Sequence, residues 1–275
     1  MTRKVALVTG ASSGIGTEVA LALLDRGYAV YGAARRVDRM TKLAERGGVA
    51  LPLDLTDERS IEACVSTVLE KEERLDVLVN NAGYGSYGAI EDVPLAEARR
   101  QFEVNLFGLA RTTQLVLPAM RKQGGGHVFN VSSIGGKIFT PMGGWYHATK
   151  HALEGWSDVL RMEVEPFGVH VVIIEPGAIA TEWGGIAHDS LLATSGEGAY
   201  QGQARGFAKA LTPSSLTGSP PRVVADTVVR ALAARRPRTR YAVGAGARPI
   251  LLARALLSDR AYDGLVRRVL RMLPS

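Results

Sequence analysis

Short apolar runs alternate with amphipathic stretches along most of the chain. The runs are rich in β-branched residues, and some, such as Val77-Leu78-Val79, are hydrophobic throughout. Uninterrupted apolar strands are typical of a sheet that helices cover on both faces. The pattern therefore predicts an α/β fold of βαβ units around a doubly wound, parallel, seven-stranded sheet. The expected strands are residues 4–8, 29–32, 50–53, 77–80, 127–131, 170–174 and 240–243.

Two segments depart from this alternation. Residues 184–219 are rich in Gly, Ala, Ser and Thr, so we expect a mobile insertion there that covers a bound substrate. Residues 248–275 mix leucines with arginines and predict a helical extension of the same domain. This extension is expected to pack on the domain or on a second subunit, with peripheral membrane contact as the alternative.

Composition narrows the class of protein. No apolar run approaches the roughly 18 residues that a membrane-spanning helix needs, and strand signals begin within the first ten residues, which leaves no room for a signal peptide. The net charge is +6, but the basic residues are dispersed and match no nucleic-acid-binding module, so nucleic acid is not an expected partner. Cys64 is the single cysteine and the histidines lack metal-ligand spacing, which predicts a cytoplasmic protein without a metal site.

A glycine-rich turn follows the first expected strand. The segment Thr9-Gly10-Ala11-Ser12-Ser13-Gly14-Ile15-Gly16 opens a helix that runs toward Leu24. Glycine lets the backbone turn sharply and approach a pyrophosphate, while the helix amino end offers free N–H groups and partial positive charge. A turn with a strand before it and a helix after it therefore predicts a dinucleotide site.

Further motifs follow along the chain. They are Asn80-Asn81-Ala82-Gly83, Asn105, Ser133, Tyr146-x-x-x-Lys150 and Pro176-Gly177. With the glycine turn, they resemble the short-chain dehydrogenase/reductase family from Lys4 to about Val243. The resemblance implies a Rossmann-like fold in which residues 1–247 bind a dinucleotide and carry out hydride transfer between an alcohol and a ketone or aldehyde. The segments Ser133-Ile134-Gly135-Gly136 and Ala152-Leu153-Glu154-Gly155 look similar to members that act on steroids and retinoids.

The choice of cofactor depends on the end of the second strand. An acidic residue there normally binds the ribose 2′-hydroxyl of NAD, whereas this chain has Ala34, Arg35 and Arg36. Because the carboxylate is replaced and guanidinium binds phosphate well, the sequence favours NADP(H), with NAD(H) as the alternative. The cofactor-binding residues implied by the turn, these arginines and the resemblance are Gly10, Ser12, Ser13, Gly14, Ile15, Gly16, Arg35, Arg36, Asp54, Leu55, Asn81, Ala82, Gly83, Tyr146, Lys150, Pro176, Gly177, Ile179 and Thr181.

Asp54 has a second interpretation. It stands shortly before a predicted helix that begins near Thr56 and Glu58, and aspartate is a common helix N-cap. The sequence leaves open whether Asp54 contacts the cofactor or caps this helix.

The expected catalytic residues are Asn105, Ser133, Tyr146 and Lys150. Tyr146 and Lys150 share a helix face at i and i+4, so the ammonium is expected to bring the phenol's pKa from about 10 toward neutrality for proton transfer. By resemblance, Ser133 hydrogen-bonds the substrate oxygen and Asn105 holds a water that relays protons from Lys150. Neighbouring polar residues, namely Ser132, His147 and His151, are expected to be structural or to line the site.

The predicted substrate walls are mostly apolar, which favours a hydrophobic secondary alcohol, ketone or aldehyde. The resemblance further implies a homodimer or homotetramer built through long helices at residues 95–120 and 145–166. A regulatory or sensor protein that binds NADP(H) without turnover is the alternative function. The expected wall residues are Tyr84, Tyr87, Ile134, Lys137, Ile138, Phe139, Met142, Trp145 and Trp183.

Overall fold

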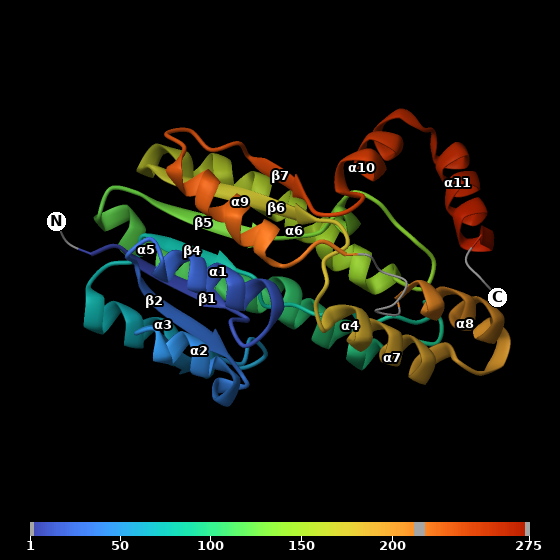
Figure 1. Cartoon of the computed structure of the whole chain (residues 1–275), viewed down its shortest axis with the longest axis horizontal. Helices are drawn as coiled ribbons and strands as arrows, with labels where there is room; N and C mark the ends of the chain where they lie inside the picture. Colours follow the sequence, from blue (N-terminus) through green and yellow to red (C-terminus); the bar gives the residue numbers. More distant parts are fainter. Residues whose placement is uncertain (1–2, 212–217, 273–275) are drawn as a thin grey trace.

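The computed structural model describes residues 3–211 and 218–272. Its centre is a sheet of seven parallel strands in the order β3-β2-β1-β4-β5-β6-β7 (Figure 1). This confirms the predicted doubly wound, Rossmann-like sheet. The strands are β1 (Val5–Thr9), β2 (Ala29–Ala34), β3 (Val49–Pro52), β4 (Val77–Asn80), β5 (Gly126–Val131), β6 (Val169–Pro176) and β7 (Arg240–Val243).

Helices cover both faces of this sheet because successive strand residues point to opposite sides. Ala6 and Val8 join one buried cluster with α1 (Gly14–Leu24) and α9 (Arg222–Ala233). Val5 and Leu7 join a second cluster with helices on the other face. Those helices are α3 (Glu58–Glu72), α5 (Gly108–Lys122) and α6 (Gly144–Val164). The short α2 (Thr41–Glu45) connects β2 to β3 along the chain.

The strand order places the ligand crevice. The chain builds β1, β2 and β3 outward to one side and then returns to add β4 on the other side of β1. In open parallel sheets the loops diverge at such a switch point and leave a crevice beyond the carboxyl ends of the strands. Residues that follow β1 and β4 therefore lie at the mouth of that crevice.

The predicted long helix at residues 95–120 is interrupted in the middle. It consists of α4 (Leu95–Phe102), a π-helical turn at Glu103–Phe107, and α5. Asn105 lies within this turn. A π-turn inserts one extra residue per turn and often marks a functional site.

The predicted lid is largely helical where the structure describes it. It contains α7 (Trp183–Ser195), a 3-10 turn at Gly198–Tyr200 and α8 (Gln201–Leu211). Ala187, Leu191, Ala204 and Ala208 are buried and pack with Tyr87, Met142 and Tyr146 in a third apolar cluster. Residues 212–217 of the expected lid lie outside the described residues, and its mobility stays a prediction.

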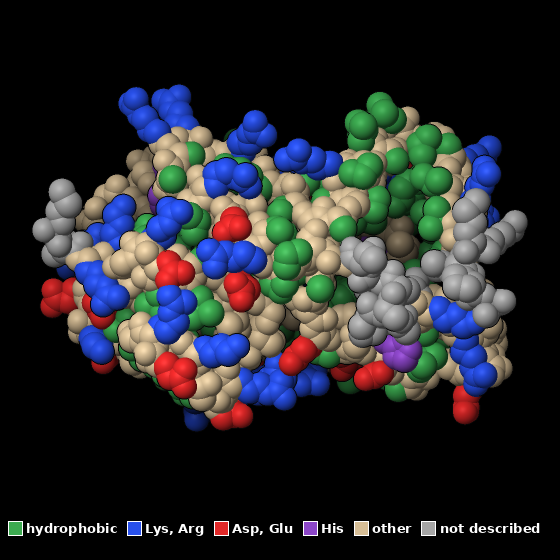
Figure 2. All heavy atoms as spheres, in the orientation of Figure 1, with side chains coloured by type: hydrophobic (Ala, Val, Ile, Leu, Met, Phe, Trp, Pro, Cys, Tyr) green, Lys and Arg blue, Asp and Glu red, His purple; other side chains and the backbone are tan. Residues whose placement is uncertain are grey.

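The C-terminal extension forms α10 (Ala247–Leu256) and α11 (Asp259–Met272), and residues 273–275 lie outside the described part. Tyr262 is buried against Phe139, with ring centroids 5.1 Å apart. Leu252, Leu256, Leu265 and Val269 are exposed. Figure 2 shows hydrophobic side chains gathered over these two helices. Within residues 3–211 and 218–272, no helix is long and apolar enough to span a bilayer.

Candidate active site

The turn between β1 and α1 is tightly built. Gly10 and Gly14 have φ angles of +69° and +53°, which side chains disfavour. The Thr9 hydroxyl accepts hydrogen bonds of 3.0 Å from the N–H groups of Asn81 and Ala82, so the ends of β1 and β4 are tied together. A Cβ on Gly16 would lie 2.2 Å from the Gly10 carbonyl oxygen.

A cleft of about 1020 Å³ opens at the carboxyl ends of the strands. Nearly all sequence-predicted site residues line it. Gly16 does not, because it lies beneath the turn and lets α1 pack against it; Asn105 also lies outside the lining. The predicted residues that line the cleft are Gly10, Ser12, Ser13, Gly14, Ile15, Arg35, Arg36, Asp54, Leu55, Asn81, Ala82, Gly83, Ser133, Tyr146, Lys150, Pro176, Gly177, Ile179 and Thr181.

Basic side chains lie where β2 ends. Arg36 donates to Ser13 Oγ at 3.4 Å and pairs with Glu182 at 3.2 Å. Arg39 pairs with the same carboxylate at 3.1 Å. The sequence reasoning missed Arg39 and Glu182, which are distant in sequence and carry no motif. Their ion pairs connect the end of β2 to the first residues of the lid.

Asp54 organises its own loop rather than capping the helix. Its carboxylate accepts hydrogen bonds from the Thr56 N–H and hydroxyl at 2.9 and 2.8 Å, whereas the N-cap of α3 is Asp57. Partial burial favours the neutral acid, but these bonds and the charges of Arg35 and Arg100 lower the pKa of Asp54. The predicted helix cap is therefore wrong, and Asp54 lines the cleft as an anion.

Tyr146 lies in the first turns of α6 and is buried. Its ring packs against Trp183 and Tyr87, with centroids 5.2 and 5.7 Å apart. Burial raises the pKa of the Tyr146 phenol to about 12, and a hydrogen bond with Ser133 opposes this in part. The phenol therefore keeps its proton at neutral pH in this structure.

Lys150 follows one turn later on α6 and is also buried. Its Nζ donates a 2.9 Å hydrogen bond to the carbonyl oxygen of Val131, at the end of β5. Burial lowers the pKa of Lys150 to about 8, and the charge of Glu154 opposes this shift. The pKa of Tyr146 is therefore not brought toward neutrality in this structure, because burial dominates and the Lys150 ammonium faces Val131.

Asn105 is held in the π-turn by three hydrogen bonds. Its Oδ1 accepts from the Tyr84 N–H at 3.1 Å, and its Nδ2 donates to the Tyr84 carbonyl and to Thr149 Oγ1 at 2.9 and 3.1 Å. A Cβ on Gly83 would meet Asn105 Oδ1 at 3.0 Å and Lys150 Nζ at 3.7 Å. Asn105 Oδ1 and Lys150 Nζ thus both lie close to this glycine. The water relay stays a prediction.

The polar neighbours of the motif divide in role. His147 is structural: Nδ1 bonds the Gly135 carbonyl at 3.0 Å, and Nε2 accepts from the Thr140 N–H at 3.1 Å. His151 Nδ1 lies 2.9 Å from the His147 carbonyl. Ser132 lines the cleft, and its buried Oγ has no hydrogen-bond partner among the described residues.

The expected substrate walls are partly wrong. Tyr84 and Trp183 line the cleft, joined by residues that the sequence did not single out, such as Ile186 and Leu211. Of the others, Tyr87 and Met142 belong to the apolar cluster under α7 and α8, Phe139 packs on Tyr262, and Lys137 pairs with Glu154. The expected wall residues outside the cleft lining are Tyr87, Ile134, Lys137, Ile138, Phe139, Met142 and Trp145.

Known proteins are similar to this chain in sequence and fold. A family model described as short chain dehydrogenase matches residues 4–189. The chain therefore belongs to the short-chain dehydrogenase/reductase family and is an oxidoreductase.

Full-length similarity extends to particular relatives. The chain is 35% identical over 271 residues to a probable short-chain type dehydrogenase/reductase, VdlC, of Helicobacter pylori, covering 96% of this chain and 97% of that protein. It is 35% identical over 285 residues to an NADPH-dependent 3-dehydrocapnine reductase of Ornithobacterium rhinotracheale, covering 98% of each. A crystal structure of a short-chain dehydrogenase from Streptomyces avermitilis superposes with a TM-score of 0.83 at 35% identity, covering 99% of this chain and 100% of that one.

Proposed function

We propose that this chain interconverts a hydrophobic secondary alcohol and ketone, or an aldehyde, using NADP(H), with Tyr146 as the general acid and base. The observation that carries the proposal is the meeting of Ser133, Tyr146 and Lys150 in the cleft that the glycine turn also lines. A protein that only sensed the nucleotide would have no need for a buried phenol beside a serine hydroxyl and a lysine.

The lining suits a dinucleotide. Gly10 and Gly14 allow close approach of a pyrophosphate to the amino end of α1, where N–H groups are free to donate. Asp54 and Leu55 would contact the adenine, and Asn81 to Gly83 the inner ribose. Lys150 would hold the nicotinamide ribose, with Ile179 and Thr181 at the nicotinamide. When bound, the nicotinamide supplies or accepts the hydride.

The proton step belongs to the protein. Tyr146 is protonated at neutral pH, and burial raises its pKa further, to about 12. It donates its proton to the carbonyl oxygen as negative charge develops there. Ser133 donates a hydrogen bond to the same oxygen. Lys150 stabilises the phenolate left on Tyr146 when its ammonium turns from Val131 toward the phenol, which the shared helix face permits. Asn105 would hold the water that returns the proton.

NADP(H) is favoured over NAD(H) by charge. Arg35 and Arg36 line the end of the cleft after β2, and Arg36 already binds one anion there, the Glu182 carboxylate. A 2′-phosphate would offer the same guanidinium a stronger partner. The 3-dehydrocapnine reductase relative is NADPH-dependent by its name.

The substrate is proposed to be apolar around its carbonyl group. Trp183, Ile186 and Leu211 contribute apolar lining from α7 and α8, which cover the phenol in the manner of a lid. A homo-oligomer through α4, α5 and α6 is also proposed. Cytoplasmic location and the absence of membrane contact by the tail stay predictions.

One assay tests this function. The purified protein is mixed with NADPH or NADH and a panel of aliphatic, aromatic and long-chain ketones and aldehydes, and loss of nicotinamide absorbance is followed. Oxidation of NADPH with apolar carbonyls, and slower oxidation of NADH, is expected. Binding of NADPH with no oxidation by any carbonyl would favour the sensor function instead.

A further inference from the structure

A buried carboxylate lies one helical turn beyond Lys150. Glu154 is on α6 and its side chain is 3% exposed. Residues at i and i+4 share a helix face, with Cβ atoms about 5–6 Å apart. Tyr146, Lys150 and Glu154 therefore follow one another at successive turns, and all three are buried.

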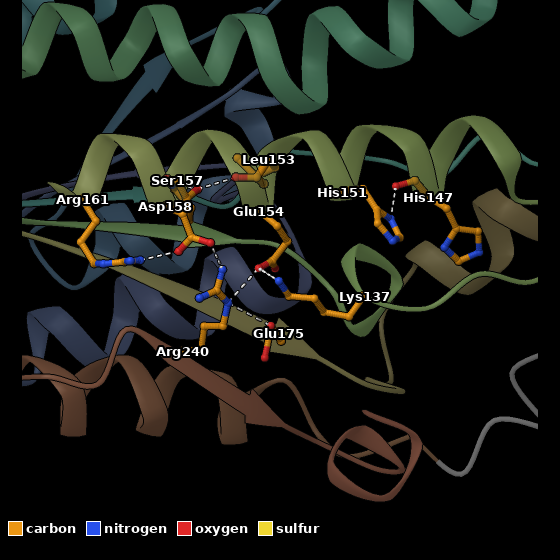
Figure 3. A network of polar contacts seen from close by, with 11 residues as sticks. Lys137, His147, His151, Leu153, Glu154, Ser157, Asp158, Arg161, Glu175 and Arg240 are labelled. Atoms are coloured by element: carbon orange, nitrogen blue, oxygen red, sulfur yellow. Dashed lines mark hydrogen bonds and ion pairs between the residues drawn. The ribbon is translucent and has the colours of Figure 1, made fainter. Parts of the chain in front are cut away.

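Two cations hold one oxygen of this carboxylate (Figure 3). Oε2 pairs with Arg240 Nε of β7 at 3.0 Å and with Lys137 Nζ at 3.3 Å. Arg240 also pairs with Asp158 at 2.6 Å and with Glu175 of β6 at 3.5 Å. Oε1 is buried and has no hydrogen-bond partner among the residues that the structure describes.

The chain makes room for this carboxylate. A Cβ on Gly136 would lie 2.8 Å from Glu154 Cγ and 2.9 Å from both the Lys150 carbonyl oxygen and Ser132 Oγ. The loop after β5 thus packs directly on the Lys150–Glu154 turn. A buried carboxylate is costly, the more so beside a second buried acid, Glu175, so it calls for a physical reason.

Lys150 supplies that reason. The hydrogen bond that the structure gives its Nζ is to a neutral group, the Val131 carbonyl. Burial lowers the pKa of Lys150 to about 8, and the opposing influence is the charge of Glu154. Without it, a lysine at this depth would lose its proton closer to neutral pH.

We propose that Glu154 is a positioning residue that keeps Lys150 in its ammonium form, and that Lys137 tempers its effect from the other side. The inference deepens the proposed function and rests on it for its consequence in catalysis. Besides Lys150, one turn earlier on α6, the charged groups around Glu154 are Lys137 after β5, Arg240 on β7, and Glu175 on β6 and Asp158 on α6, which both pair with Arg240 (Figure 3).

The charges predict shifts of opposite sign. Glu154→Gln removes an anion near Lys150 and should lower the pH at which Lys150 loses its proton by about 1 unit. Lys137→Met removes a cation and frees the carboxylate, so it should raise that pH. Glu154→Asp keeps the charge and should stay near wild type.

A titration of Lys150 in the protein without cofactor reads this directly. ¹³C-labelled lysine is followed by NMR across pH, with Lys150→Met assigning the signal. Asp158→Asn is the control, because Asp158 shares Arg240 and α6 but lies two turns beyond Lys150. A Glu154→Gln midpoint at the wild-type value, or one lowered equally by Asp158→Asn, would overturn the proposal.

Activity separates the proposal from the function on which it rests. In carbonyl reduction, the fall of kcat/KM at high pH should move with the Lys150 midpoint, to lower pH in Glu154→Gln and to higher pH in Lys137→Met. If the NMR midpoints shift as expected while this limb stays fixed, Glu154 tunes Lys150 but the catalytic role of Lys150 is wrong. A loss of stability alone would move neither quantity.

Discussion

Burial sets the charge of single side chains around the cleft. Glu175, at the end of β6, is buried, and this raises its pKa to about 7, with the charge of Glu154 adding to the shift. Arg240 and Lys137 oppose the shift without cancelling it. The folded protein therefore binds a proton on Glu175 more tightly than the unfolded chain does.

This proton makes stability depend on pH. The contribution of Glu175 is full below its ordinary pKa of 4.5 and is lost as pH rises through about 7. Glu175→Gln lacks this loss, so its melting temperature should exceed that of wild type at pH 8, by a margin that shrinks toward pH 5. Thermal melts of both proteins across this range check it. A difference that does not vary with pH would contradict the assignment.

At the scale of residues, the motifs located the site but not its charge states. The spacing of Ser133, Tyr146 and Lys150 is enough to bring them into one cleft. The pKa of Tyr146 depends instead on Trp183 and Tyr87, which come from distant segments and desolvate the phenol. Such contacts leave no local signal in the sequence.

Among the elements, the turn between β1 and α1 is tightly packed. In Gly16→Ala the new methyl group would meet the Gly10 carbonyl, which cannot move without the turn. We expect the free energy of unfolding to fall by about 1–3 kcal/mol and NADPH to bind at least tenfold more weakly. Urea denaturation measures the first quantity and fluorescence titration the second.

Gly264→Ala is the matched control. Gly264 lies within α11, outside the proposed interface, and a Cβ there meets nothing within 4 Å. This variant should gain about 0.5–1 kcal/mol, because alanine favours a helix interior over glycine. If Gly16→Ala proved as harmless as Gly264→Ala, the turn would not be as confined as the structure has it.

The ion pairs of Glu182 connect the lid to the end of β2. Arg36→Ala should raise the KM for NADPH about tenfold, because one charge-assisted hydrogen bond to the 2′-phosphate is lost. The KM for NADH should stay nearly unchanged. Glu182→Gln should lower the KM for NADPH, since a phosphate then competes with no carboxylate. Steady-state kinetics with both cofactors decide it, and equal effects on both would refute the 2′-phosphate site.

The sequence predicts those strands and helices whose own residues carry a clear apolar pattern. The expected strands begin and end within two residues of the observed ones. The agreement is close because buried parallel strands are continuous apolar runs. Helices α7 and α8 were not predicted, because their many small residues favoured a mobile insertion instead. Their buried Ala187 and Leu191, and Ala204 and Ala208, recur at i and i+4, a signal that would have revealed both helices.

The molecule as a whole presents apolar side chains on its long helices. Leu95 of α4, Phe107 of the π-turn, and Val159 and Met162 of α6 are exposed, Met162 by 70%. Such residues are expected where a second subunit covers them. This supports the proposed homo-oligomer through these helices.

Met162→Glu should dissociate that assembly, because it places a charge in an apolar contact. Leu256→Glu is the control: Leu256 is 75% exposed on α10, away from the proposed interface. Light scattering should give a smaller mass for Met162→Glu alone. Dissociation by Leu256→Glu instead would move the interface to the C-terminal helices.

The most direct test of the central claim is the effect of Tyr146→Phe on turnover and on cofactor binding, measured in the same preparation. The substitution removes the hydroxyl and keeps the ring that packs on Trp183 and Tyr87. We expect kcat for carbonyl reduction to fall by about 10²- to 10⁴-fold, the usual contribution of a general acid. The Kd for NADPH should stay within about twofold, a change of less than about 0.4 kcal/mol. Turnover at the wild-type rate would show that Tyr146 is not the general acid.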